Sequence, residues 1–435
     1  MEKTSSLELL ERRKKSVANG VGVYNTATVR EAKGAIIIDE DGNELLDFAG
    51  GIGVVNAGHC PEPVVKAIQE QAAKYIHTSF NVVTYEPYIE LCEVLCEILP
   101  HGDQTKAMLV STGAEAVENA IKIARQATGR QGILGFSDAY HGRTMMAMTL
   151  TSRIDYKYNC GPFAPEVYRI PFPNFFRYNE GKSLDEFVDW KLKSLEESTK
   201  NLVDPKSLAA IIIEPIQGEG GFNLVPQRYF EGLRSFCDEH GILLIADEVQ
   251  SGFGRTGHWA SWQHYNVQPD LSTYAKSMGS GLPIAAVVGK AKIMDAAQPG
   301  TIGGTYIGSP ISCAASLATI QYMKDIDLNS KALQIGKVIT HKFEQLKSEF
   351  TEIGDVRGLG AMIAMEFVKN KDPRQPDGGL CKQIVKDCAV KGLIILSAGA
   401  HKNVIRILCP LVITEEQLNK GLEIIESVIY NLIKK

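Results

Sequence analysis

One lysine, Lys276, stands between an apolar run and a glycine-rich stretch, in the segment Thr273-Tyr-Ala-Lys-Ser-Met-Gly-Ser-Gly-Leu-Pro-Ile. A lysine forms a Schiff base with an aldehyde only when it is partly desolvated and its neutral form is accessible at working pH. The setting of Lys276 suggests such a lysine. A solvated surface lysine is the usual alternative, so this interpretation depends on finding other groups that would bind the same aldehyde.

A candidate phosphate site lies at Ser111-Thr-Gly-Ala-Glu115, between the apolar run Ala107-Met-Leu-Val110 and a helical stretch. Gly113 and Ala114 leave the backbone uncovered, so their N–H groups and the helix dipole can hold a phosphate. The alternative is that Ser111 or Thr112 only caps the helix, and this motif alone favours the alternative.

A second candidate is an acidic group at the end of an otherwise apolar strand, in Ile245-Ala-Asp-Glu-Val-Gln250. A buried charge there is costly without a cationic partner. An aspartate facing a pyridine nitrogen would keep that nitrogen protonated and make the ring an electron sink. Asp247 is the candidate, because alternation along a strand turns Glu248 the other way. A capping or ion-paired acid is the alternative.

Two more strand ends carry suitable side chains. Tyr140-His-Gly-Arg143 offers an aromatic ring for stacking and an arginine for a carboxylate, and Glu214-Pro-Ile-Gln-Gly-Glu219 offers two acids. Catalytic groups of an open α/β sheet collect at the carboxyl ends of its strands. With Lys276, five strand ends therefore predict a site for pyridoxal phosphate.

A competing motif is Gly252-Phe-Gly-Arg-Thr-Gly257, which satisfies the dinucleotide pattern G-x-G-x-x-G and has Asp270 at a suitable distance. The residues after it give no clear glycine-to-helix entry, and the motif lies late in the α/β region. An NAD-dependent dehydrogenase is kept as a distant alternative, which predicts a colourless purified protein.

The elements that must position these groups alternate between helical stretches and short apolar runs, which is typical of an α/β domain with a largely parallel sheet and helices on both faces. We predict an N-terminal segment over 1–60, a large domain over 61–325 and a smaller α+β domain over 326–435. The predicted helices are 64–75, 87–99, 115–127, 228–239, 331–350 and one opened by Thr414; the predicted strands are 35–39, 44–48, 107–110, 133–136, 209–213, 242–246, 285–288, 362–367, 393–396 and 404–408; 370–379 is predicted as an exposed loop.

The bulk properties indicate a soluble globular protein of the cytoplasm. The chain has 435 residues, 44% of them hydrophobic, and a net charge of -5, so it presents no basic field for nucleic acid or an anionic membrane. No apolar run approaches the roughly 20 residues that span a bilayer. The nine cysteines are scattered, which favours free thiols and core packing over disulfides or a metal site.

The motifs resemble the class III (ω-amino acid) aminotransferases, and most closely the 4-aminobutyrate aminotransferases among them. This resemblance implies pyridoxal phosphate as the cofactor and its fold type I, with a small domain built from the N- and C-terminal segments. The matching stretches are Asp47-Phe-Ala-Gly-Gly-Ile52, Thr84-Tyr-Glu-Pro-Tyr88, Gly113-Ala-Glu-Ala-Val-Glu-Asn119, Tyr140-His-Gly-Arg-Thr144, Ile213-Glu-Pro-Ile-Gln-Gly-Glu-Gly-Gly221, Asp247-Glu-Val-Gln250, Ala275-Lys-Ser277, Gly303-Gly-Thr-Tyr306 and Asn403-Val-Ile-Arg-Ile-Leu408.

The resemblance also implies a role for each matching residue. Lys276 resembles the lysine that carries the cofactor, Asp247 the partner of the pyridine nitrogen, and Gln250 a hydrogen bond to the phenolic oxygen. Tyr140 and Val249 resemble the two faces of the ring sandwich.

The phosphate site would be completed by Gly113, Ala114 and the partner subunit's Thr305. This implies a homodimer with shared active sites, and leaves open whether dimers pair into tetramers. The resemblance also implies that Glu214 is one of the cofactor-binding residues.

By the same resemblance, Arg143 would hold the far carboxylate of 4-aminobutyrate and Arg406 the α-carboxylate of glutamate. Glu219 would pair with Arg406 when the ω-amino substrate leaves that arginine without a ligand, and Ile52 would form an apolar wall. The implied reaction converts 4-aminobutyrate and 2-oxoglutarate into succinate semialdehyde and glutamate. Ornithine, acetylornithine and other ω-amino acids are the alternative donors.

Overall fold

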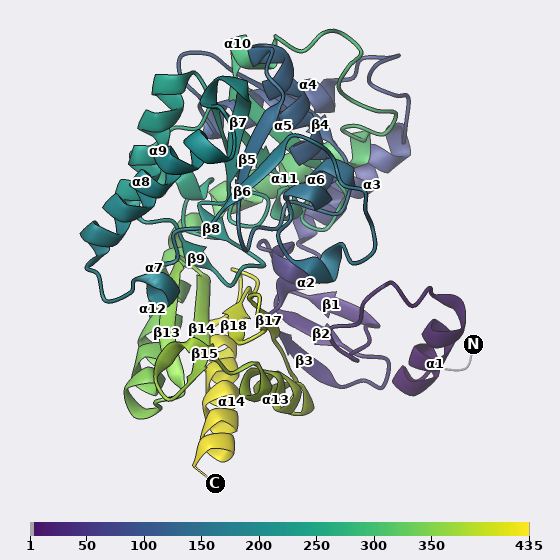
Figure 1. The fold of residues 1–435 in the computed structure, drawn as a ribbon. Coiled ribbons are helices and arrows are strands. Elements are labelled where there is room, and N and C mark those ends of the chain that lie inside the picture. The colour runs from purple at the N-terminus through teal and green to yellow at the C-terminus, as the bar shows by residue number, and fades with distance from the viewer. Residues whose placement is uncertain (1–3, 435) are drawn as a thin grey trace.

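The computed structural model describes residues 4–434 and contains a large α/β part above a smaller part that holds both chain ends (Figure 1). The large part is organised around a seven-stranded sheet. Its strands, in order across the sheet, are β4 (Thr105–Val110), β12 (Ala285–Lys290), β11 (Leu271–Tyr274), β10 (Leu243–Asp247), β7 (Leu208–Ile213), β5 (Gly132–Phe136) and β6 (Val167–Ile170).

Within this sheet, β12 alone runs antiparallel to its neighbours, and the other strands point the same way. The interior strand β7 is buried along its whole length. A parallel sheet covered on both faces requires such continuous apolar strands. Because six strands are parallel, their carboxyl ends share one edge of the sheet, which faces the smaller part.

Helices cover both faces of the sheet. Figure 1 shows α8 (Leu184–Asn201) and α9 (Gln227–His240) on one face, and α5 (Gly113–Thr128) and α6 (Met145–Leu150) on the other. Helix α5 begins with a capping box between Thr112 and Glu115 and ends at the left-handed Gly129. These end signals fix where the first turn of α5 meets the carboxyl end of β4.

The smaller part joins the two ends of the chain through its sheets. One sheet has the order β1 (Glu31–Lys33), β2 (Ile36–Ile38), β3 (Glu44–Asp47) and β16 (Leu393–Ile394), with β16 parallel to β3. The other has the order β13 (Ile353–Leu359), β14 (Met362–Lys369), β18 (Val404–Ile407) and β17 (Leu396–Ala398), and β15 (Asp372–Pro376) pairs with β14.

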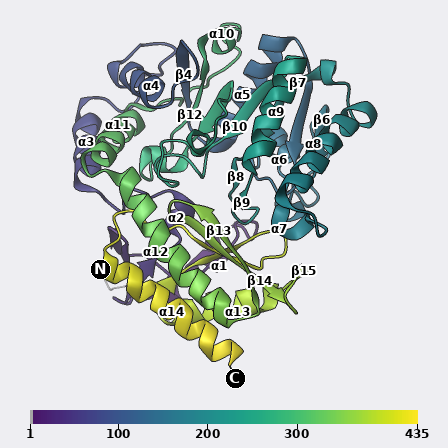
Figure 2. The same cartoon turned by 90° about the vertical axis from the view of Figure 1, so that its left-hand side faces the viewer.

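The long helices α12 (Leu328–Glu349) and α14 (Glu415–Ile433) contact each other and run across the smaller part of the molecule (Figure 2). None of the helices within residues 4–434 is long and apolar enough to cross a membrane. The remaining elements are α1 (Ser6–Ser16), α2 (Gly50–Gly53), α3 (Glu62–Lys74), α4 (Glu86–Ile98), α7 (Phe175–Tyr178), α10 (Ala291–Met294), α11 (Pro310–Asp325), α12 (Leu328–Glu349), α13 (Gly378–Val390), α14 (Glu415–Ile433), the short strands β8 (Ile216–Gln217) and β9 (Asn223–Leu224), and the 3₁₀ turns η1 (Ile154–Tyr156), η2 (Pro205–Ser207), η3 (Ser261–His264) and η4 (Lys276–Gly279).

Most predicted elements are present, and two predictions are wrong in part. The single strand predicted over 393–396 is two short strands, β16 and β17, which belong to different sheets. The hairpin of β2 and β3, the helices α3, α4, α5, α9 and α12, and the capped helix α14 are confirmed. The predicted loop over 370–379 instead contains β15 and the start of α13. Its prolines and aspartates mislead because β15 is an edge strand, where proline is tolerated.

Candidate functional site

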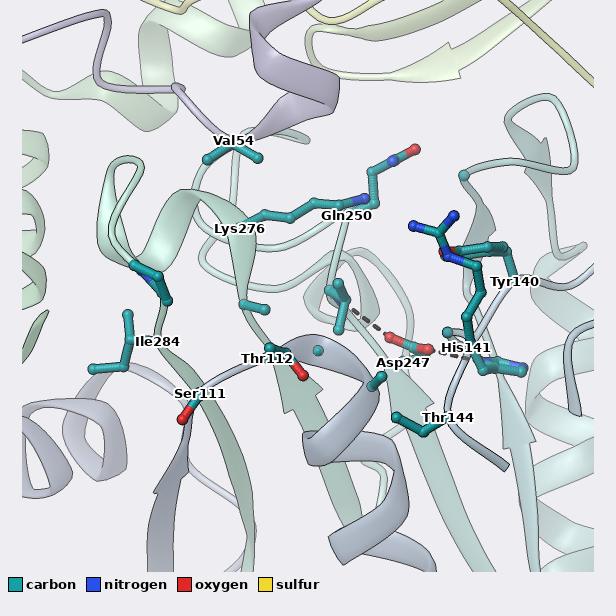
Figure 3. Close-up of a pocket in the computed structure, with 18 of the residues that line it drawn as sticks. Val54, Ser111, Thr112, Tyr140, His141, Thr144, Asp247, Gln250, Lys276 and Ile284 are labelled. Carbon is teal, nitrogen blue, oxygen red and sulfur yellow. Dashed lines mark hydrogen bonds and ion pairs between the residues drawn. The ribbon is translucent and has the colours of Figure 1, made fainter. Parts of the chain in front are cut away.

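A cavity of about 550 Å³ opens at the carboxyl ends of the parallel strands (Figure 3). Its walls come from the segments that follow β4, β5, β7, β10 and β11, so the predicted strand ends do meet. The predicted residues that line it are Gly113, Ala114, Tyr140, Arg143, Glu214, Glu219, Asp247, Val249, Gln250 and Lys276.

Lys276 opens the 3₁₀ turn η4 directly after β11 and has the left-handed φ of 51°. Its side chain runs across the cavity toward Gln250 (Figure 3). Burial lowers the pKa of Lys276 to about 8, although the negative charge of Glu219 opposes the shift. The neutral, nucleophilic fraction of this amine near neutral pH is therefore much larger than that of an ordinary lysine.

Asp247 ends β10, is 4% exposed as a residue, and has hydrogen bonds on both carboxylate oxygens. Its Oδ2 accepts from Nδ1 of His141 at 2.6 Å, and its Oδ1 accepts from Oγ1 of Thr273 at 3.0 Å and the backbone N–H of Val249 at 3.1 Å. Burial opposes protonation of His141, but the bond to Asp247 outweighs it and raises the pKa of His141. The pair holds Asp247 in one orientation at the cavity wall.

Glu214 is buried beside this pair and ties two segments together. Its Oε2 accepts from the backbone N–H of Tyr140 and its Oε1 from that of Gly218, both at 3.0 Å. Burial, partly offset by the charge of His141, raises the pKa of Glu214 to about 7. Glu214 thus fixes the backbone that carries the Tyr140 ring, and it also lines the cavity.

The start of α5 forms a cradle for an anion. Thr112 caps the helix by accepting from Glu115, and no hydrogen bond within residues 4–434 uses the N–H groups of Gly113 or Ala114. A Cβ on Gly113 would lie 2.9 Å from Cγ1 of Val249. The glycine therefore allows the helix start and Val249 to approach closely, with free N–H groups at the positive end of the helix dipole.

Gln250 provides a second indication that the cavity binds a polar ligand. Its side chain is buried, yet neither Nε2 nor Oε1 has a hydrogen-bond partner among the described residues. An unsatisfied buried amide is costly. The Gln250 amide lines the same cavity as the anion cradle at the start of α5. It is therefore suited to bond an oxygen on the ring of a ligand whose phosphate lies in that cradle.

A second cavity, of about 770 Å³, adjoins the first and shares Tyr140, Arg143, Glu219 and Lys276 with it. It brings in Ile52 and Arg406 from distant parts of the chain, so the structure unites all four residues predicted to choose the substrate: Ile52, Arg143, Glu219 and Arg406. Arg406 lies on β18, and Ile52 lies in the glycine-rich turn α2.

Glu219 and Arg406 form an ion pair between the two parts of the molecule. Nη1 of Arg406 donates to Oε1 of Glu219 at 2.6 Å, and Oη of Tyr156 donates to its Oε2 at 3.1 Å. Burial opposes ionisation of Glu219, but Arg406 outweighs it and lowers the pKa of Glu219 to about 2. Glu219 is therefore an ionised carboxylate that neutralises Arg406 at the cavity wall.

The other two residues of this cavity differ from that pair. Arg143 is exposed and forms no ion pair within residues 4–434, so its guanidinium is free to bind a carboxylate. Ile52 adopts φ 66°, an outlier for a β-branched residue, and its neighbours Gly51 and Gly53 are also left-handed. The tight turn places an apolar side chain at the cavity wall.

Two predicted features lie outside the cavities. Thr305 is exposed and lines neither cavity. Residues Gly252–Gly257 form a series of turns, and the next helical element is only the 3₁₀ turn η3. The glycine-to-helix entry of a dinucleotide site is therefore missing from this motif.

Two side chains of the site were not identified from the sequence. His141 lies in the motif Tyr140-His-Gly-Arg143, but nothing in this motif indicates which side chain reaches Asp247. Tyr156 ends the 3₁₀ turn η1 after α6, far in sequence from Glu219, and carries no recognisable signal.

A pyridoxal-phosphate-dependent enzyme is defined by four features of this structure: the parallel sheet, the anion cradle at the start of α5, the buried Asp247 and the desolvated Lys276. Comparison with known proteins gives the family, since the model described as aminotransferase class-III matches residues 17–429. The chain belongs to the class III aminotransferases, whose cofactor is pyridoxal phosphate.

Three similar proteins illustrate the range of the family. A probable 4-aminobutyrate aminotransferase of Bacillus subtilis is 45% identical over 418 residues, covering 96% of this chain and 96% of the relative. A 5-aminovalerate aminotransferase of Pseudomonas putida is 47% identical over 428 residues, covering 98% and 99%. The structure of a taurine:2-oxoglutarate aminotransferase from Bifidobacterium kashiwanohense, in complex with pyridoxal phosphate and glutamate, is 29% identical with a TM-score of 0.92 and covers 100% of both chains.

Proposed function

We propose that this enzyme transfers the amino group of 4-aminobutyrate to 2-oxoglutarate, yielding succinate semialdehyde and glutamate. One observation carries the proposal: the cavity beside Lys276 holds two arginines, of which Arg143 is free and Arg406 is paired with Glu219. An ω-amino acid has one carboxylate, whereas glutamate has two. An enzyme that takes both needs one permanent carboxylate anchor and one that can be occupied by the protein itself.

In the half-reaction with the ω-amino acid, Arg143 holds the single carboxylate and so aims the distant amine at Lys276. Glu219 stays on Arg406, which would otherwise present an unpaired charge in a partly buried cavity, at considerable cost. Ile52 packs against the carbon chain. The amine-bearing carbon then lies next to the Nζ of Lys276.

In the half-reaction with glutamate or 2-oxoglutarate, Arg143 takes the side-chain carboxylate. The α-carboxylate displaces Glu219 and binds Arg406, which exchanges one ion pair for another. The two half-reactions then present their reacting carbon at the same place, although the substrates differ in their number of carboxylates.

The cofactor would be held by groups that fit its parts. Gly113 and Ala114 would donate N–H bonds to its phosphate, Gln250 would bond its phenolic oxygen, and Tyr140 and Val249 would lie on the two faces of its ring. When bound, pyridoxal phosphate supplies an aldehyde that accepts the amino group and a ring that takes up electrons.

The remaining chemistry belongs to the chain. Nζ of Lys276 would take a proton from the amine-bearing carbon of the donor and deliver it to the aldehyde carbon of the cofactor, and its pKa of about 8 suits this transfer near neutral pH. Asp247 accepts a hydrogen bond from His141, and its carboxylate would hold a proton on the pyridine nitrogen of the cofactor.

We also propose a homodimer in which Thr305 completes the phosphate site of the partner subunit. Thr305 is exposed and away from its own cavity, and the apolar side chains of Tyr306, Val82 and Val83 are exposed as well. Light scattering of the purified protein tests this, and a stable, active monomer would overturn it.

A second donor, 5-aminovalerate, is favoured by the relative that is 47% identical and named for it. Ornithine and acetylornithine are further alternatives. A panel of amino donors with 2-oxoglutarate, compared by kcat/KM, decides among them. We expect 4-aminobutyrate to be the best donor, and faster turnover of 5-aminovalerate, ornithine or acetylornithine would overturn this assignment.

A further inference from the structure

Glu219 is held by two side chains that use different oxygens. Nη1 of Arg406 bonds Oε1 at 2.6 Å, whereas Oη of Tyr156 bonds Oε2 at 3.1 Å. No other side chain within residues 4–434 forms a hydrogen bond with this carboxylate. Because the two donors do not share an oxygen, Glu219 can leave Arg406 by turning about its bond to Tyr156.

Tyr156 has a setting that suits it to hold a carboxylate. It ends the 3₁₀ turn η1 and lines the same cavity as Glu219 and Arg406. The guanidinium of Arg153 lies 5.1 Å from its ring centroid, and the Tyr140 ring meets it edge to face at 4.9 Å. A cation over the ring draws electron density from it and strengthens the phenol as a donor.

Arg153 adds positive charge at the same place. Its side chain is largely buried, lines the cavity, and is fixed by a bond of 3.0 Å from Nη2 to Oδ2 of Asp155. Lys402 bonds the same carboxylate oxygen at 3.2 Å, so one acid serves two cations there. A carboxylate that moves toward Tyr156 therefore stays in a positive field.

We propose that Tyr156, backed by Arg153, is the second resting place of the Glu219 carboxylate, occupied when a substrate carboxylate takes Arg406. This inference rests on the proposed exchange at Arg406. It makes Tyr156 a positioning residue that acts through Glu219, and assigns it to one half-reaction only, the one whose substrate carries two carboxylates.

The two states of Glu219 depend on Tyr156 to different extents. When Glu219 is paired, Arg406 compensates its charge and the bond to the phenol adds little. When Glu219 is released, the phenol is the donor that remains, and a hydrogen bond to an uncompensated charge in a poorly solvated cavity is stronger. Removing the hydroxyl therefore penalises the released state more than the paired state.

The test compares Tyr156→Phe with Tyr158→Phe, a control two residues away whose ring is 73% exposed. Glutarate, with two carboxylates, must displace Glu219, whereas butyrate, with one, need not. Calorimetry on the cofactor-loaded enzymes measures both affinities. We expect Tyr156→Phe to weaken glutarate about tenfold, as for loss of one hydrogen bond to a charged group, and to change butyrate by less than about twofold. Tyr158→Phe should change neither.

Stopped-flow absorbance of the bound cofactor gives an independent readout. In Tyr156→Phe we expect kcat/KM of the half-reaction with glutamate to fall about tenfold while the half-reaction with 4-aminobutyrate is nearly unchanged. In a Glu219→Gln background the same substitution should lose this selectivity, because no charge remains to be held. A selective effect that persists in that background would overturn the proposal.

Two other results would also overturn it. Equal loss for glutarate and butyrate would make Tyr156 a purely structural residue, and tighter glutarate binding would mean that Tyr156 holds Glu219 onto Arg406. Failure of the proposed function is distinguishable, since it shows as a wild type that does not react with 4-aminobutyrate. Phenylalanine retains the ring that packs against Tyr140, and thermal unfolding checks that the variant folds.

Discussion

The two cavities that meet at Lys276 are built in different ways. The cofactor cavity is formed by segments that follow neighbouring strands of one sheet, and its acids Asp247 and Glu214 are buried and held by backbone N–H groups as well as side chains. Each of these groups has one position. Such groups support chemistry that is the same for every substrate.

The substrate cavity is assembled from segments far apart in the chain, including residues 20–24, the turn α2 and strand β18. Its charged groups are either free, as Arg143 is, or paired with a partner that a ligand can replace, as Arg406 is. We call the lining of the cofactor cavity, with Lys276, Asp247 and Glu214, the fixed wall. We call the lining of the substrate cavity, with Arg143, Glu219 and Arg406, the exchangeable wall. The contrast teaches that the fixed wall sets the reaction, whereas the exchangeable wall selects which substrate carboxylates reach it.

The largest expected effect comes from replacing Lys276, the reactive residue of the fixed wall. Lys276→Ala should lower kcat at least about a thousandfold, because one residue supplies both the cofactor linkage and the proton transfer. Steady-state assays with 4-aminobutyrate and 2-oxoglutarate measure this. Lys292→Ala, at an exposed lysine on the same domain, should retain activity. Substantial turnover by the Lys276 variant would refute the mechanism.

The fixed wall was also the part that the sequence predicted best. Strand ends, a helix start and a motif with two adjacent acids are local signals, and a parallel sheet brings its carboxyl ends together whatever the details. Helices α3, α4, α5 and α9 were placed to within a few residues because prolines, glycines and caps mark their ends. Which residues bind the cofactor stays a prediction, as do the domain boundaries and the cytoplasmic location.

What the sequence did not reveal depends on non-local contacts. Helix α11 was missed because it is buried on several sides, including at Ser312, Ser316 and Thr319, so it shows no apolar stripe. Strand β6 is short and at the sheet edge. The bonds of His141 to Asp247 and of Tyr156 to Glu219 span 106 and 63 residues, and no spacing rule connects such pairs.

The next prediction tests whether the fixed wall works through charge rather than shape. Asp247→Asn keeps the size of the side chain but removes its charge, so kcat should fall about a hundred- to a thousandfold. Glu248→Gln changes the adjacent acid, which bonds Ser251, Ser261 and Trp262 away from the cavity. That variant should lose about 1–3 kcal/mol of unfolding free energy yet keep its kcat. Equal kcat for the two variants would remove Asp247 from the mechanism.

Breaking the exchangeable wall should give a smaller and selective effect. Arg406→Gln removes the anchor for the α-carboxylate, so kcat/KM for glutamate should fall about a hundredfold. The half-reaction with 4-aminobutyrate should fall less, because Arg143 is untouched. Measuring both half-reactions separately gives the ratio. Equal losses would mean that Arg406 maintains the cavity rather than choosing its ligand.

A double variant separates anchor loss from stranded charge. Arg406→Gln alone leaves the largely buried Glu219 carboxylate without its cation. This should raise the pKa of Glu219 and destabilise the protein whenever Glu219 is ionised. Adding Glu219→Gln removes that charge. We expect the double variant to recover part of the 4-aminobutyrate half-reaction and none of the glutamate half-reaction.

The smallest expected effect asks whether the two walls are independent. The Lys276 amine reacts only when neutral, so in the cofactor-free protein its labelling by an amine-directed reagent should rise about tenfold per pH unit below pH 8 and level off above. Glu219 belongs to the substrate wall but raises the pKa of Lys276 through its negative charge. Glu219→Gln should therefore lower the Lys276 pKa further and increase labelling at pH 7 about threefold, leaving the plateau unchanged. Mass spectrometry of the labelled peptide, with Lys292 as the internal reference, measures both. Unchanged labelling would show that Glu219 acts on carboxylates alone, and a higher rate would show that the acid that selects the substrate also tunes the amine that reacts with it.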